Sequence, residues 1–230
     1  MKKRFLAAAI SAAIASLPMT AAAYQAGDWI VRGGAALVDP DESSSKISVA
    51  GLGGAVGGTS VGVDNDTQLG LTFTYMFTSN IGLELLASTP FEHDVTAAGL
   101  DAYGVPSGTK IASVKHLPPT LSLEYFFMDA NSAWQPYAGI GINYWLVTDK
   151  ELSSDAKSVL GARKLNVDNS VGLALQLGMD YSINQNWLVN AAIWKIDIST
   201  TADFQSAVGK VKADIDIDPW VYMIGVGYKF

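Results

Sequence analysis

The chain has 230 residues, of which 49% are hydrophobic and 16% charged, and its formal net charge is -7. This acidic balance argues against nucleic acid as a partner. Cysteine is absent, which excludes a disulfide framework, a thiol nucleophile and a cysteine-based zinc site. After the N-terminal segment no apolar stretch approaches the roughly 20 residues that a membrane-spanning helix needs. The hydrophobic residues must therefore be distributed over short segments.

Residues 1–23 have the organisation of a secretory signal peptide. The basic residues Lys2–Arg4 precede an apolar run from Phe5 to Leu17, and the small residues Ala21–Ala23 follow. The run is too short for a membrane helix, and small residues at its end are typical of a cleavage site. We therefore expect export, a mature chain that begins at Tyr24, and a formal charge that falls from -7 to about -10 when three basic residues are removed.

From residue 28 onward, eight segments alternate large apolar residues with small or polar ones. In chain order they are residues 28–38, 67–77, 81–91, 116–127, 136–147, 169–181, 187–199 and 213–230. In the clearest one, the odd positions from Leu69 to Phe77 are all large and apolar, whereas the even positions are mostly small or polar. A period of two predicts β-strands with one apolar face. We expect four antiparallel hairpins.

The connections between these segments alternate in length. Short turns are predicted at residues 78–80, 129–133 and 182–186, and long loops at residues 39–66, 92–115, 148–168 and 200–212. In outer-membrane barrels short turns face the periplasm and long loops face the outside. We expect the same orientation here, with a short helix around Ala156 to Leu160 in the third long loop.

Two kinds of barrel fit eight alternating strands: a soluble, lipocalin-like barrel with its apolar residues inside, and a membrane barrel with them outside. The bulky faces have too many large residues for an eight-stranded interior, while the opposite faces are rich in Gly, Ser and Thr, which a narrow lumen accommodates. On the last strand, aromatic residues at both ends flank aliphatic ones, as expected where a strand crosses a bilayer. The outward-facing residues there are Trp220, Tyr222, Ile224, Val226, Tyr228 and Phe230.

The sequence therefore predicts an all-β protein in which residues 24–230 form an eight-stranded antiparallel transmembrane β-barrel. Its expected location is the outer membrane of a Gram-negative bacterium, with outer-membrane lipid as a partner. The aromatic C-terminal residue, Phe230, resembles the terminal assembly signal of outer-membrane barrels. This resemblance implies the barrel assembly machinery as a partner during biogenesis.

Charged residues are expected to face the lumen near its periplasmic end. They are Arg32, Glu84, Glu124, Asp180 and Lys229. In so narrow an interior these charges must pair and form hydrogen bonds, because an unpaired buried charge is strongly unfavourable. One interpretation is a network that only stabilises the barrel; the other is a plug that blocks a continuous water channel.

Higher in the lumen, the inward-facing residues are less polar and suggest an apolar funnel. They include Leu86, Pro118, Thr120, Trp194 and Val221. Trp194 and Lys195 cannot both face inward without a bulge. On spacing alone, Trp194 fits a position in the lipid-facing aromatic belt equally well.

Pro118 and Pro119 are two consecutive residues without the N–H group that a β-ladder needs. In hydrocarbon each unsatisfied backbone group costs several kcal/mol, so the neighbouring carbonyl groups need partners on the luminal side. One interpretation is a strand end that bends into a loop. The other is a lateral opening through which a solute leaves the lumen for the membrane.

Several motifs resemble the outer-membrane protein W (OmpW) family: Thr67–Met76, Ala87–Phe91, His116–Thr120 and Asp218–Val221, together with Pro136–Tyr144 and Trp187–Asn190. The similarity covers nearly all the strands and is weaker in the long loops. It implies an eight-stranded outer-membrane barrel associated with passage of small, mostly hydrophobic molecules, some members being linked to alkane or amino-acid uptake. It also implies that Leu86 and Trp194 form the lumen constriction.

The favoured function is a channel or facilitator for small hydrophobic solutes, and the alternative is a structural or adhesive barrel that acts as a receptor through its outer loops. An enzyme is disfavoured because no Ser-His pairing is evident. No cofactor is expected, and no metal, because His93 and His116 do not have a metal-ligand spacing.

Overall fold

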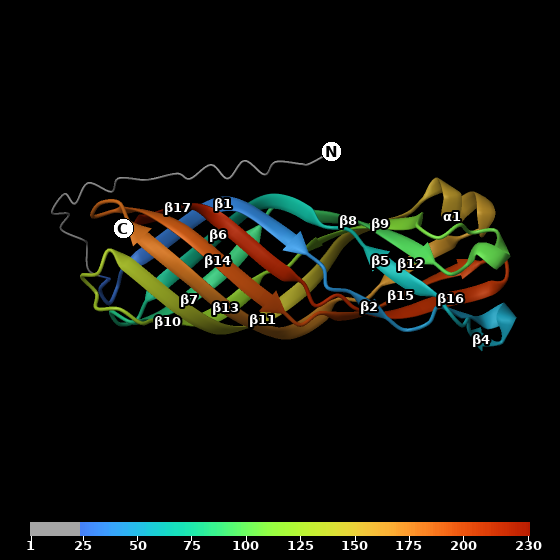
Figure 1. Cartoon of the computed structure of the whole chain (residues 1–230), viewed down its shortest axis with the longest axis horizontal. Helices are drawn as coiled ribbons and strands as arrows, with labels where there is room; N and C mark the ends of the chain where they lie inside the picture. The colour runs from blue at the N-terminus through green and yellow to red at the C-terminus, as the bar shows by residue number, and fades with distance from the viewer. Residues whose placement is uncertain (1–23) are drawn as a thin grey trace, which may run out of the picture.

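A closed barrel of eight antiparallel strands forms one half of the molecule (Figure 1). The computed structural model describes residues 24–230, so the predicted signal peptide at residues 1–23 lies outside the described residues. In order around the barrel, the strands are β1 (Trp29–Asp39), β6 (Asp66–Met76), β7 (Ile81–Ser88), β10 (Thr120–Phe126), β11 (Trp134–Leu152), β13 (Ser170–Ser182), β14 (Trp187–Ile196) and β17 (Trp220–Lys229). Pairing between β1 and β17 closes the ring. The predicted fold class is confirmed.

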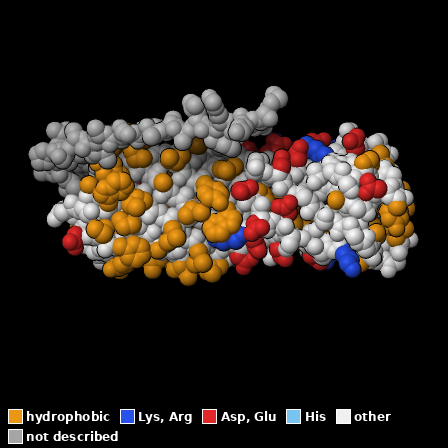
Figure 2. Space-filling view, in the orientation of Figure 1, with side chains coloured by type: hydrophobic (Ala, Val, Ile, Leu, Met, Phe, Trp, Pro, Cys, Tyr) orange, Lys and Arg blue, Asp and Glu red, His pale blue; other side chains and the backbone are white. Residues whose placement is uncertain are grey.

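Large apolar side chains cover the outer surface of this barrel (Figure 2). On β13, Leu175 and Leu177 are at least half exposed, whereas Gln176 between them is buried. Aromatic rings gather at the end with the short connections, where the ring centroids of Tyr228 and Phe230 lie 4.7 Å apart. An apolar outer surface with an aromatic girdle is the surface that a bilayer solvates. The bulky faces therefore point away from the lumen, as predicted.

Glycine allows the first and last strands to approach each other closely. Gly34 on β1 pairs with Gly225 on β17. A Cβ atom at Gly34 would lie 2.1 Å from the carbonyl oxygen of Ile224, and one at Gly225 would lie 2.2 Å from that of Gly33. Any side chain at either position would separate the two strands, so glycine is required where they close the barrel.

The barrel wall continues into a second β-rich half, which contains the four long connections (Figure 1). We call this half the extension. The upper part of β11 pairs with β9 (Thr109–Leu117), β9 with β8 (Phe91–Ala98), and β8 with β5 (Ser60–Val63). A second sheet has the order β12 (Arg163–Val167), β15 (Ser199–Ser206), β16 (Gly209–Asp216), β3 (Ser48–Val49) and β4 (Gly54–Ala55), with β2 (Ser43–Ser44) also paired to β16. The short helices η1 (Ala50–Leu52), η2 (Asp101–Tyr103) and α1 (Ser154–Val159) lie in the same half.

The prediction that the long connections are loops was wrong, because most of their residues form these strands. The predicted last strand, residues 213–230, is in fact two strands: β16 ends at Asp216 and β17 begins at Trp220. Asp218 between them has φ of 38°, in the left-handed region that extended strands do not use. The chain therefore turns there, at the junction between the barrel and the extension.

The short helix predicted around Ala156 to Leu160 is present as α1. Its N-cap is Ser153, whose side-chain oxygen accepts a hydrogen bond from the backbone N–H of Ala156 at 3.0 Å. This bond satisfies one of the free N–H groups of the first turn. Across residues 24–230, no helix has the length and apolar character required to cross a bilayer.

Candidate solute-binding site

A buried charged cluster crosses the barrel lumen, with Arg32 at its centre. The Arg32 guanidinium donates hydrogen bonds to Asp180 Oδ1 through Nε at 3.0 Å, and through Nη1 to Glu84 Oε2 at 3.2 Å and Thr74 Oγ1 at 2.7 Å. Both ion pairs are almost completely shielded from solvent. The sequence predicted Arg32, Glu84, Glu124 and Asp180 at this level of the lumen, and the structure brings all four together.

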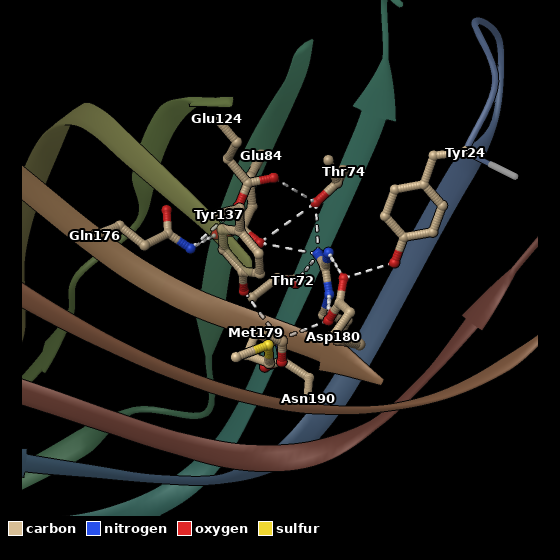
Figure 3. Close-up of polar contacts among 11 residues, drawn as sticks. Tyr24, Thr72, Thr74, Glu84, Glu124, Tyr137, Gln176, Met179, Asp180 and Asn190 are labelled. Carbon is tan, nitrogen blue, oxygen red and sulfur yellow. Dashed lines mark hydrogen bonds and ion pairs between the residues drawn. The ribbon is translucent and has the colours of Figure 1, made fainter. Parts of the chain in front are cut away.

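Neutral side chains complete this cluster (Figure 3). Gln176 Nε2 donates to Glu84 at 2.8 Å and to Glu124 at 3.1 Å, and the Tyr24 hydroxyl donates to Asp180 at 2.7 Å. Further members are Thr72, Tyr137 and Asn190, so that side chains from β1, β6, β7, β10, β11, β13 and β14 meet. We call these ten residues the floor. Sequence reasoning missed the neutral members because inward amides and hydroxyls have no distinctive spacing.

Lys229, the fifth predicted charge, forms an ion pair with Asp28 at 3.3 Å. A small apolar cluster lies in the same part of the barrel. Its members are Tyr24, Ile30, Met76, Phe126, Tyr137 and Leu188, all at most 2% exposed. Because Tyr24 and Tyr137 belong both to this cluster and to the floor, apolar packing adjoins the charged groups directly and helps to exclude water from them.

Leu86 and Trp194, the predicted constriction, are buried in another apolar cluster that also contains Val221 and Met223. Trp194 is completely buried, and β14 pairs with both neighbours without a bulge. The next residue on β14, Lys195, is partly exposed and forms an ion pair with Asp41 at 3.2 Å. These contacts resolve the ambiguity of the sequence: Trp194 faces the lumen and does not belong to the lipid-facing belt.

An apolar cavity of about 300 Å³ lies within the extension. Hydrophobic side chains line nearly all of it, and the polar lining residues are His93, Thr96, His116, Thr200 and Ser206. Some members of the Leu86–Trp194 cluster, such as Ile217, line the cavity, whereas Leu86 and Trp194 do not. Other members of this cluster therefore form part of the cavity wall. The cavity was not predicted, because its walls come from segments that were expected to be loops.

The two histidines, for which the sequence suggested no role, lie together in the cavity wall. The rings of His93 and His116 stack with centroids 5.0 Å apart, and Phe91 and Trp145 contact His116 at 5.7 Å and 5.2 Å. Burial in these apolar surroundings lowers the pKa of His116 to about 3, so its ring is neutral at physiological pH. Within residues 24–230, no group of three or more His, Cys, Asp or Glu side chains is arranged to hold a metal ion.

Strand pairing lapses beside Pro118 and Pro119. Pairing between β7 and β10 ends at Leu86 opposite Thr120, and pairing between β8 and β9 starts again at Phe91 opposite His116. The ladders therefore leave residues 87–90 and 117–119 unpaired with each other. We call this interruption of the ladder the gap.

The carbonyl groups of both prolines have partners within the protein. The fully buried Asn143 donates through Nδ2 to the Pro118 oxygen at 3.0 Å, and the Tyr144 backbone N–H donates to the Pro119 oxygen at 2.9 Å. A luminal side chain thus satisfies one carbonyl group, as the physics of a lipid-embedded wall requires. β9 ends at Leu117 and β10 begins at Thr120, and both pair with β11, so the two prolines lie between two strands that share one neighbour.

The fold and the buried floor define the class of protein as a small outer-membrane β-barrel. A sequence model described as the OmpW family matches residues 25–230, and the chain belongs to this family. It is 43% identical to outer membrane protein W of Escherichia coli strain K12 over the whole of both chains. The crystal structure of OprG from Pseudomonas aeruginosa is similar, with a TM-score of 0.84 and 49% identity over 90% of this chain and 98% of that one. A more distant relative is dibenzothiophene metabolism operon protein PahQ of Pseudomonas aeruginosa, 26% identical over 82% of each chain.

Membership of this family places the protein in the bacterial outer membrane, with the short connections at the periplasmic end and the extension outside.

Proposed function

We propose that the protein is a facilitator for the uptake of small hydrophobic molecules. A solute enters the cavity from outside, is stopped by the floor, and leaves sideways through the gap into the membrane. The observation that carries this proposal is the combination of an apolar cavity on the outer side with a fully buried charged network across the barrel. The name of PahQ, which refers to an operon for metabolism of an aromatic, hydrophobic compound, supports the same solute class.

An apolar rim around the cavity supports capture from outside. Each of the four long connections contributes one large exposed hydrophobic residue that also lines the cavity: Leu52, Tyr103, Val159 and Val208. Their exposed fractions range from 45% to 57%. Exposed apolar groups that surround a concave apolar site are characteristic of ligand binding. We propose that they lower the barrier for a hydrophobic solute to leave water.

The floor favours exit of a solute through the barrel wall over passage along the barrel axis. A solute that moved straight down would have to separate Arg32 from Asp180 and Glu84, and breaking a buried ion pair costs about 3–5 kcal/mol. Movement through the gap breaks no ladder pair, because residues 117–119 have no pairing across to β7 or β8. The gap opens towards hydrocarbon, where an apolar solute is favourably solvated.

Replacement of Pro118 and Pro119 by Val tests this exit. Valine supplies two N–H groups and favours a continuous ladder, so we expect hydrophobic uptake to fall close to that of cells without the protein. Uptake of labelled octane would be measured at equal surface abundance. Pro106→Val, in an exposed turn of the extension, is the control and should leave uptake unchanged. Unchanged uptake in the double variant would rule out the lateral route.

The exposed rim also fits the alternative function, a receptor that binds a partner through the extension. Substitution of Leu52, Tyr103, Val159 and Val208 by Ser separates the two. A facilitator loses solute uptake, whereas a receptor loses attachment of its partner and keeps solute flux unchanged.

A further inference from the structure

Two carboxyl groups of the floor, those of Glu84 and Glu124, lie side by side between the same two neutral side chains (Figure 3). Thr74 Oγ1 is 3.3 Å from Oε2 of each glutamate. Gln176 Nε2 is 2.8 Å from Oε1 of Glu84 and 3.1 Å from Oε1 of Glu124. The two carboxyl groups also lie within hydrogen-bonding reach of each other. Both residues are at most 1% exposed, so bulk water does not screen one group from the other.

The positive charge of the floor is engaged mainly by other oxygen atoms. Arg32 carries the only positive charge among the ten floor residues, and it forms ion pairs with Glu84 and Asp180. Within residues 24–230, Glu124 forms no ion pair with a Lys or Arg side chain, and its two hydrogen-bond partners are neutral. If all three carboxyl groups were ionised, two negative charges would be uncompensated. Buried charge without compensation is strongly unfavourable.

The unequal surroundings of the two glutamates indicate where a proton resides. Two carboxyl groups that share a site do not ionise together readily, because the first negative charge repels the second. Glu84 receives a hydrogen bond from the Arg32 guanidinium at 3.2 Å, which stabilises its ionised form. The donors to Glu124 among the described residues are neutral, which favours the neutral acid there. The O–H group of that acid can donate to Glu84.

We propose that Glu84 and Glu124 share one proton at neutral pH, carried by Glu124 and donated to Glu84, and that this proton keeps the floor closed. Loss of the proton leaves two adjacent carboxylates with no solvent between them to screen their charges. Their repulsion separates the two side chains and admits water and ions to this level of the lumen. The inference concerns the floor alone and does not depend on the route of a solute.

Other titratable groups face the pair from the neighbouring elements, and each has a partner of its own. Tyr24 donates to Asp180, Asp180 also accepts from Arg32, and Tyr137 accepts from Asn190. On β17, Lys229 forms an ion pair with Asp28. Because Glu124→Gln leaves all these groups in place, a comparison of this variant with the unchanged protein isolates the contribution of the pair.

Infrared spectroscopy of the purified protein in detergent tests the proton directly, because the C=O stretch of a neutral carboxyl group is distinct from that of a carboxylate. We expect this neutral band near pH 7, and labelling of glutamate with ¹³C should shift it. Glu124→Gln keeps the shape of the neutral acid and should remove the band. The control is Glu92→Gln, in an exposed ion pair of the extension with Lys115, and it should retain the band.

Unfolding and conductance test the consequence for the floor. In the unfolded chain glutamate ionises at a pH of about 4.3, so near neutral pH the folded state holds one more proton than the unfolded state. The unfolding equilibrium constant of the unchanged protein, divided by that of Glu124→Gln, should therefore rise about tenfold per pH unit above pH 7 until the folded state loses the proton. Ion conductance in planar bilayers should rise severalfold between about pH 7 and pH 10 in the unchanged protein and in Glu92→Gln, but not in Glu124→Gln.

Absence of the neutral band in the unchanged protein would overturn the shared proton. A band that the glutamate label does not shift, or one that persists in Glu124→Gln, would place the proton on another group and overturn it equally. Conductance with the same pH dependence in the unchanged protein and Glu124→Gln would contradict the sealing role of the proton. If Glu124→Gln does not fold, the labelled band of the unchanged protein and its loss on alkalinisation, together with the rise in conductance, decide the result.

Discussion

The floor, in the barrel, and the cavity, in the extension, are two buried regions that follow opposite rules. In the floor, Arg32 forms ion pairs with Glu84 and Asp180, and Glu124 lies within hydrogen-bond distance of Thr74 and Gln176. In the extension, the described residues that line the cavity are almost all hydrophobic and include no Asp, Glu, Lys or Arg. This contrast indicates that polar and charged side chains fill the lumen of the barrel at the floor, whereas the region that is left apolar and incompletely packed is the one suited to bind a solute.

The largest effect is expected from Arg32→Met. This change leaves Asp180, Glu84 and Glu124 buried without the cation that they surround, and we expect a loss of about 3–5 kcal/mol in the free energy of unfolding. The measurement is urea unfolding in detergent, followed by gel mobility. Lys195→Met removes a partly exposed ion pair with Asp41 and is the control, with an expected change below about 1 kcal/mol. Equal stability of the two variants would show that the floor does not hold the barrel together.

Leu86→Ala and Leu188→Ala separate the two regions by function. Both leucines are at most 5% exposed, Leu86 in the cluster next to the cavity and Leu188 in the apolar cluster next to the floor. Each change should destabilise the barrel by about 2–5 kcal/mol, because it deletes buried methyl groups and leaves a void. Only Leu86→Ala should change the rate of octane uptake, measured at equal surface abundance. Equal effects on uptake would show that the two clusters do not differ in function.

A smaller, pH-dependent effect is expected in the extension. The folded-state pKa of His116, about 3, lies below the ordinary value of 6.5, so the unfolded state binds the proton more readily. Stability is therefore fully present above pH 6.5 and declines as the pH falls towards about 3. Two neighbouring groups shift the pKa of His116 in opposite directions: His93 lowers it further, and Asp66 raises it.

We expect the extension to become more sensitive to proteolysis on acidification, and His116→Phe to reduce this pH dependence. The measurement is limited proteolysis of the extension near pH 7 and near pH 4. The same pH dependence in His116→Phe as in the unchanged protein would assign the effect to other groups.

The sequence predicts the barrel far better than the extension, for a physical reason. Lipid contacts one whole face of each barrel strand, so that face must be uniformly apolar, as from Leu69 to Phe77. The extension strands have shorter patterns interrupted by glycine. In residues 209–216 the alternation of Val211, Ala213 and Ile215 with charged residues is visible, but its second half was assigned to the following barrel strand.

The candidate site shows the same contrast. Charges at inward positions are conspicuous, so the sequence predicted four members of the floor. The stacking of His93 on His116 was missed because it depends on the register between β8 and β9. In this register Phe91 lies opposite His116, and His93 lies opposite Val114. When a segment is predicted to be a loop, no strand register is predicted for it. The sequence then does not show which distant residues lie side by side. The cavity was missed for the same reason.

Reversible blocking of the gap tests whether a solute leaves the lumen there. The chain contains no cysteine, so Ala87→Cys, at the gap, and Ala191→Cys, on the exposed outer surface of β14, each provide a single thiol. Both variants would be treated with a bulky thiosulfonate reagent, and octane uptake would be measured before treatment, after treatment and after reduction. We expect modification at position 87 to stop uptake and reduction to restore it, while modification at position 191 has no effect. Unchanged uptake with the reagent attached at position 87 would contradict exit of the solute at the gap.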